Sequence, residues 1–133
     1  MTNLVFEKYS EDQLFKDCIE LSCPDGYIKV FDEIYEVVKS FNEKHKINVV
    51  FGQVKIKFGR LVVYLQPLID NSDANIYDSP ISIDYDVLIK KIEIMCKKTG
   101  QMCVVCGKKT STIVIDTRII EKCFDHYDTN QGR

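Results

Sequence analysis

The stretch "INVVFGQVKIKFGRLVVYLQP", residues 47–67, decides the fold of this chain. It is rich in Val, Ile, Phe and Tyr, which favour strands, and apolar side chains alternate with lysines over residues 54–58. Within residues 58–60, Gly59 supplies the backbone freedom that a tight turn requires. Pro67 ends the second strand because it cannot donate a ladder hydrogen bond. The stretch therefore predicts two antiparallel strands joined by a short turn.

A helical pattern precedes this hairpin. Residues 10–21, "SEDQLFKDCIEL", begin with Ser10 as a potential N-cap and Gln13 three positions later, which is a capping box. The apolar residues that follow fall on one helical stripe: Leu14, Phe15, Cys18, Ile19 and Leu21. A breaker at residues 23–26, "CPDG", separates this predicted helix from a second amphipathic helix that runs from residue 28 to near Asn42.

A third helix is expected after the hairpin, beyond a polar, turn-rich loop over residues 68–80. Asp84 or Asp86 is its expected N-cap, and it ends before Gly100. Its apolar side is formed by Val87, Leu88, Ile92 and Met95 or Cys96. These patterns together predict an α+β fold in which helices pack on a small antiparallel hairpin.

Length and composition indicate one globular domain of 133 residues, with a helix and hairpin core at 1–100 and a smaller lobe at 101–128. No apolar run is long enough to span a membrane, and the first residues lack the pattern of a secretory signal. We therefore expect a cytoplasmic protein without membrane contact. In a reducing compartment, six cysteines favour metal binding or burial as apolar residues over disulfides.

Residues 102–126, "MCVVCGKKTSTIVIDTRIIEKCFDH", contain two paired motifs. Cys103 and Cys106 form a Cys-x2-Cys knuckle, and sixteen residues later Cys123 and His126 form a Cys-x2-His pair. Three thiolates and one imidazole at this spacing are typical of a closed structural Zn²⁺ site without an open position for water. The pattern predicts a treble-clef-like or zinc-ribbon-like lobe, with one strand around residues 110–116 and a short helix from near Cys123. We expect Cys18 and Cys96 to be core residues instead.

No catalytic constellation can be assembled from the remaining residues. A zinc deaminase needs a His-x-Glu motif before its cysteines, and none is present. The Asp-His pair at residues 125–126 resembles the start of a histidine–metal nuclease motif, but only seven residues follow it. The one other histidine is His45 in a polar segment, and the six glycines form no phosphate-binding loop. We therefore predict no catalytic residues and no enzymatic activity.

Two surfaces are candidates for contact with a partner. Lys55, Lys57 and Arg60 lie around the hairpin turn and form either a working surface or, more simply, charges that keep an edge strand from aggregating while Phe58 and Leu61 join the core. The expected loop after the hairpin carries carboxylates that can mimic nucleic acid toward a basic partner: Asp70, Asp73 and Asp78.

The order of the motifs resembles an uncharacterised bacterial and phage family. Its members carry Asp-Gly-Trp before a helix, a Gln-Val-Lys-Glu-Lys-Phe-Gly-Gly-Leu-Arg-Phe-Tyr hairpin, and a terminal Cys-x-x-Cys-Gly with Cys-x-x-His. Residues 53–59 and Leu61 match the hairpin motif, with Ile56 at the position of its Glu, and the resemblance covers residues 23–126. Tyr27 stands at the position of the family's Trp and Arg60 at that of the second hairpin Gly. The resemblance implies the zinc lobe and a bacterial or phage setting, and it implies no reaction.

The resulting hypothesis is a small non-enzymatic zinc protein that binds another protein. Toxin immunity proteins and phage inhibitors of host defence complexes are examples of this class. A zinc module that binds nucleic acid is the alternative, because lysines flank the knuckle and the hairpin, although the pI of about 5.7 is acidic. A degenerate nuclease is a third and weaker possibility.

Overall fold

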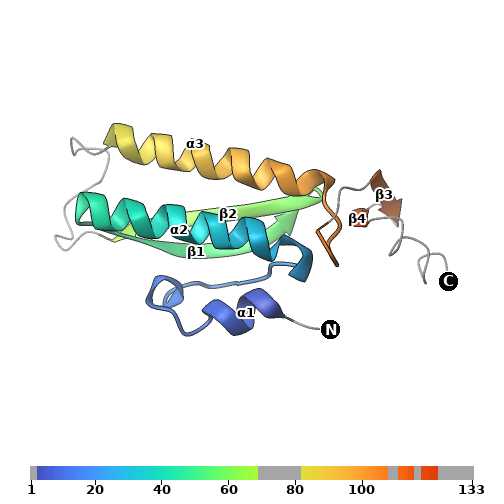
Figure 1. The fold of residues 1–133 in the computed structure, drawn as a ribbon, viewed down its shortest axis with the longest axis horizontal. Helices are drawn as coiled ribbons and strands as arrows, with labels where there is room; N and C mark the ends of the chain where they lie inside the picture. The colour runs from blue at the N-terminus through green and yellow to red at the C-terminus, as the bar shows by residue number, and fades with distance from the viewer. Residues whose placement is uncertain (1–2, 69–81, 108–110, 116–117, 123–133) are drawn as a thin grey trace.

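The computed structural model describes residues 3–68, 82–107, 111–115 and 118–122. Figure 1 shows two long helices lying along one hairpin, with the N-terminal segment at one side and a second, smaller hairpin near the C-terminus. The elements in chain order are α1 (Leu4–Tyr9), η1 (Gln13–Phe15), η2 (Asp25–Tyr27), α2 (Ile28–His45), β1 (Asn48–Lys57), β2 (Arg60–Leu68), α3 (Ser82–Lys98), η4 (Thr99–Gln101), β3 (Ser111–Ile115) and β4 (Arg118–Lys122). The α+β class predicted from the sequence is confirmed.

The predicted hairpin is confirmed as the antiparallel pair β1 and β2. Their register leaves Phe58 and Gly59 as a two-residue turn, and both have positive φ, +54° and +78°. Such a turn matches the twist of the two strands. The pairing register shifts at Gly52, where a β-bulge lies between Phe51 and Gln53. The bulge changes the direction of the first half of β1.

The helix predicted over residues 10–21 is wrong. Ser10 is the C-cap of α1, and after a single 3-10 turn the chain runs extended beside β1. Leu21 pairs in parallel with Val54, supported by hydrogen bonds from Ile19 N to Gly52 O (2.9 Å) and from Val54 N to Glu20 O (2.8 Å). Backbone pairing along the outer edge of β1 thus outweighs the local capping signal, and it leaves Ile19 81% exposed.

An aromatic cluster holds this N-terminal segment against α2 and β1. The rings of Phe15 and Phe51 stack with centroids 4.4 Å apart, and Phe31 lies 5.6 Å from Phe51. The hydroxyl of Tyr35 donates to the Asp12 carboxylate at 2.6 Å. Burial, followed by this hydrogen bond and the charge of Asp12, raises the pKa of Tyr35 to about 12. The cluster replaces the helical packing expected for Phe15.

Helices α2 and α3 cover one face of the hairpin, as the apolar spacing of the sequence predicts (Figure 1). Helix α2 extends beyond Asn42 to His45, and α3 begins at Ser82, before both expected caps. The buried side of α3 is formed by Tyr85, Leu88, Ile92, Met95 and Cys96. Val87, expected on that side, is 59% exposed because it lies on the opposite side of the helix. None of the described helices is long and apolar enough to cross a bilayer.

The C-terminal region contains a hairpin where one strand was expected. Strand β3 matches the predicted strand, and β4 pairs with it antiparallel from Ser111–Lys122 to Ile115–Arg118. Strand β4 was not predicted. The helix expected from near Cys123 lies outside the described residues. The loop expected at residues 68–80 also lies outside them, except for Leu68, which is the last residue of β2. The predicted treble-clef-like or zinc-ribbon-like lobe therefore stays a prediction.

Candidate functional site

The Cys-x2-Cys segment after α3 folds as a tight turn. The backbone N–H of Val105 donates to the Cys103 sulfur at 3.3 Å, and the N–H of Gly107 donates to the Cys103 carbonyl at 2.9 Å. Gly107 has φ +83°, which a residue with a Cβ rarely adopts. Cys103 is fully buried, whereas Cys106 is exposed. An N–H directed at sulfur favours a thiolate, so this turn has the hydrogen bonding that a metal-bound cysteine requires.

The turn is packed directly against the start of α2. The N–H of Gly26 donates to the carbonyl of Val104 at 2.9 Å, and the Tyr27 hydroxyl donates to the carbonyl of Met102 at 3.4 Å. A Cβ built on Gly26 would collide with the Cys103 carbonyl oxygen and lie 2.8 Å from the nitrogen of Gly107. The Asp-Gly-Tyr segment thus forms the seat of the knuckle, and only glycine fits at its centre.

Two of the four predicted zinc ligands can be placed. Cys103 and Cys106 are described, while Cys123 and His126 lie outside the described residues. Within the described ranges, no group of three or more metal-binding side chains gathers at one point. The four-residue Zn²⁺ site accordingly stays a prediction, to which the geometry of the knuckle adds support.

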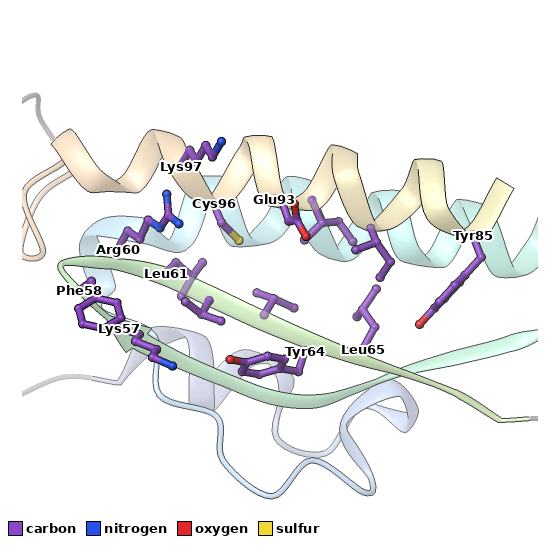
Figure 2. Close-up of a pocket in the computed structure, with 14 residues that line it drawn as sticks. Lys57, Phe58, Arg60, Leu61, Tyr64, Leu65, Tyr85, Glu93, Cys96 and Lys97 are labelled. Atoms are coloured by element: carbon purple, nitrogen blue, oxygen red, sulfur yellow. The ribbon is translucent and has the colours of Figure 1, made fainter. Parts of the chain in front are cut away.

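A groove of about 610 Å³ runs between β2 and α3 (Figure 2). Strand β2 contributes every residue from Arg60 to Leu65. Helix α3 contributes the residues of its facing side: Tyr85, Ile89, Ile92, Glu93, Cys96 and Lys97. The apolar lining of the groove consists of Leu61, Val62, Val63, Leu65, Ile89, Ile92 and Cys96. A groove of this size and lining can bury the side chains of a bound ligand or peptide.

Charged and aromatic residues line one end of this groove. Figure 2 shows Arg60 extending from β2 toward Cys96 and Lys97 of α3, while Lys57 lies on the other side of the hairpin tip with Phe58. The Lys57 ammonium is 5.5 Å from the centre of the Phe58 ring, and that of Lys55 is 5.8 Å from the Tyr64 ring. Phe58 is 81% exposed and Tyr64 45%. This end of the groove is therefore both cationic and aromatic.

The hairpin residues singled out from the sequence are only partly brought into this site. Lys57 and Arg60 line the groove, whereas Lys55 does not. Leu61 is a core residue as expected, but the placement of Phe58 in the core is wrong because its backbone lies at the turn, where the side chain projects outward. The predicted acidic residues Asp70, Asp73 and Asp78 lie outside the described residues.

Sequence reasoning missed the contribution of α3 to this site, including Ile89 and Lys97. The available signal was the unbroken apolar run at residues 61–65. A strand with one solvated face alternates apolar and polar side chains, so this run indicates a strand covered on both faces. His45, the histidine outside the zinc motif, has its Nε2 4.0 Å from the carboxylate of Asp84, where it connects the end of α2 to the start of α3.

Thr99 closes the basic end of the groove. This fully buried residue accepts a hydrogen bond from Leu61 N at 2.8 Å through Oγ1 and donates to the Cys96 carbonyl at 2.6 Å. We expect Thr99→Val to lower the free energy of unfolding by about 2 kcal/mol, because the Leu61 N–H is left buried without an acceptor. Thr99→Ser keeps the hydroxyl, so its effect should be under about 1 kcal/mol. Urea unfolding of both variants checks this, and equal losses would contradict it.

Two buried thiols, Cys96 in the lining of the groove and Cys23 in the core, should make stability depend on alkaline pH. Burial raises the pKa of Cys96 to about 11, opposed by the Val63 N–H and by Arg60, and burial raises that of Cys23 to about 12. A thiol whose pKa is higher in the folded chain than in the unfolded chain contributes its full stabilisation below the unfolded pKa of 9.0. This contribution is lost as the pH rises from 9.0 through the folded pKa of about 11. From about pH 8 to about pH 10.5, Cys96 should therefore account for a loss of roughly 2 kcal/mol.

Urea midpoints measured at both pH values check this expectation. The variant Cys96→Ala should lose less stability between them than the wild-type chain does, and Cys18→Ala, at a half-buried thiol, serves as the comparison. An identical pH dependence in wild type and Cys96→Ala would contradict it.

Comparison of the chain with protein-family models, with curated proteins and with solved structures finds no match. The resemblance to a bacterial and phage family therefore stays a prediction.

Proposed function

We propose that this chain is a non-enzymatic binding protein whose working surface is the groove between β2 and α3, and whose partner is another protein. One observation carries the proposal. The apolar groove is lined at its edge by the exposed rings of Phe58 and Tyr64 and by the cationic side chains of Lys57 and Arg60. Interfaces between proteins combine an apolar centre, aromatic anchors and arginine in this way. Inhibition of a toxin or of a defence complex by occupying its surface is the kind of action that such a site supports.

The proposed Zn²⁺ has a structural role in this scheme. Cys103, Cys106, Cys123 and His126 would hold it as a closed set, and the metal would fold the C-terminal residues onto the seat formed by Gly26 and Tyr27. This role is supported by the N–H directed at the Cys103 sulfur and by the positive φ of Gly107. The knuckle follows η4 at the end of α3, so the metal would stabilise the same end of the helix that carries Lys97.

A random-peptide display library tests the binding proposal. The immobilised protein is compared with Ile89→Glu, which places a carboxylate at a half-buried position of the groove, and with Ile94→Glu as a matched control. Ile94 lies on the same helix, is 60% exposed and does not line the groove. We expect enriched peptides that bind wild type and Ile94→Glu and lose at least about tenfold in affinity to Ile89→Glu. Enriched peptides that bind all three proteins alike would overturn the proposal, as would a library that yields none.

A nucleic-acid partner is the second candidate, favoured by the two exposed rings that accompany Lys55 and Lys57. Bases stack on such rings, and lysines neutralise phosphates. A titration of oligothymidylate binding against salt separates the two candidates. Affinity that falls steeply with added salt would favour nucleic acid, whereas absence of binding at low salt would exclude it.

A further inference from the structure

Resting on the proposed function, we infer that the groove takes an acidic segment of another protein, with a large apolar side chain in the groove and a carboxylate at Arg60 and Lys97. Both residues line the groove, and Figure 2 shows Arg60 on β2 and Lys97 on α3 at the end nearest the hairpin turn. In the part of the chain that the structure describes, no carboxylate lies within ion-pair distance of Arg60, Lys97 or Lys57. Cations that have no ion-pair partner among the described residues, beside an apolar groove, match a segment that supplies both an anion and an apolar anchor.

Among the described residues that line the groove, cationic side chains outnumber carboxylates. Helix α3 brings one carboxylate to the groove, that of Glu93, about one turn before Lys97. Arg60 acts on the sulfur of Cys96, where its positive charge lowers the thiol pKa against the larger effect of burial. Figure 2 shows the Arg60 side chain extending from β2 toward α3. Its fork of donors can bind a carboxylate in a bidentate manner, and Lys97 adds a second charge to the same anion.

The occupant is recognised through side chains and not by adding a strand to β2. Val54 directs its N–H and C=O toward residues 20–22, so the opposite residue Val63 directs its own groups away from β1, into the groove. Three donor positions along this outer edge are closed. Leu61 N–H is bonded to Thr99, Val63 N–H lies at the Cys96 sulfur, and Pro67 has no N–H. A partner strand would therefore find little to pair with.

The backbone at Phe58 supports an aromatic contact with the same occupant. At φ +54°, a residue with a Cβ is in the left-handed region, where asparagine or glycine is favoured at this turn position. A bulky ring that is 81% exposed gains little from burial in return. Such a local cost at an exposed aromatic residue points to a role in binding. Phe58 thus extends the apolar surface beyond the end of the groove.

The test uses the peptides selected for loss of binding to Ile89→Glu, synthesised with a fluorescent label. Each is paired with a version in which Asp and Glu are replaced by Asn and Gln. We expect the selected peptides to contain acidic residues, and the amide versions to bind wild type about tenfold more weakly. Arg60→Gln and Lys97→Gln should weaken the acidic peptides to a similar extent, and Lys98→Gln, a neighbouring exposed lysine outside the groove, should not.

Phe58→Asn gives a readout that a structural role alone would not produce. We expect it to raise the thermal midpoint, because asparagine tolerates the left-handed backbone, and to weaken peptide binding several-fold. Groove-dependent peptides whose amide versions bind equally well would overturn this inference and leave the proposed function standing. Oligothymidylate binding that depends on Arg60 and Phe58, with no groove-dependent peptide, would overturn both in favour of single-stranded nucleic acid.

Discussion

Gly26→Ala should lower the free energy of unfolding by about 3–4 kcal/mol, since the added Cβ has no space. It would collide with the carbonyl oxygen of Cys103 and lie 2.8 Å from both the nitrogen of Gly107 and the carbonyl carbon of Val104. All three are backbone atoms, so no side-chain rotation can relieve the overlap. Moving the knuckle away would lengthen the Gly26 N–H to Val104 carbonyl hydrogen bond, now 2.9 Å. Urea unfolding followed by circular dichroism measures the loss.

Gly100→Ala is the matched control for this substitution. Its Cβ would lie 3.7 Å from the Cβ of Arg60, an ordinary contact, and its φ is not in the left-handed region. We expect a change within about 0.5 kcal/mol. A second readout is local: Gly26→Ala should increase the reactivity of the metal-free Cys103 thiol toward a maleimide, because Cys103 is fully buried against this seat in the wild type. Equal stability of the two alanine variants would show that the knuckle is not seated on Gly26.

The parts of the fold that the sequence predicts correctly are those that periodicity controls. Alternation and a glycine turn predicted β1 and β2, and three- and four-residue spacing predicted α2 and α3, because each of these elements buries one continuous side. The N-terminal helix failed because its signals were local. Ser10 and Gln13 satisfy a capping rule, yet the chain after Phe15 gains more from the unpaired edge of β1.

The candidate sites depend on contacts between distant segments, so the sequence predicts them only in part. Ligand spacing predicted the turned geometry of Cys103 and Cys106 but not its contact with Gly26, which lies 77 positions earlier than Cys103 (103 − 26). The groove requires Ile89 and Lys97 to face β2 at a set distance, and no local pattern encodes that distance. Arg60 was singled out for its charge alone, and the sequence did not indicate that it lines the same groove as Lys97.

The largest expected effect is that of the metal. We predict one Zn²⁺ per chain in the purified protein, and its removal by a strong chelator should unfold the C-terminal residues, because structural zinc contributes on the order of 10 kcal/mol to small domains. Cys103→Ser, Cys106→Ser, Cys123→Ser and His126→Asn should each lose stoichiometric zinc. Elemental analysis of the variants measures this directly. Cys18→Ser is the control, because that half-buried thiol donates to the Glu20 carbonyl and has no place in the set.

Cobalt substitution separates the predicted ligand set from other zinc sites. Three thiolates and one imidazole in a tetrahedron give intense visible absorption on cobalt binding, and each of the four ligand substitutions should lower it, because each removes one ligand from the closed set. Chelation should also leave the β1–β2 hairpin and its aromatic cluster folded, since the rings of that cluster pack on one another between η1, α2 and β1. Protein without stoichiometric zinc would overturn the site. Complete unfolding on chelation would instead show that the Gly26 seat couples the metal to the whole core.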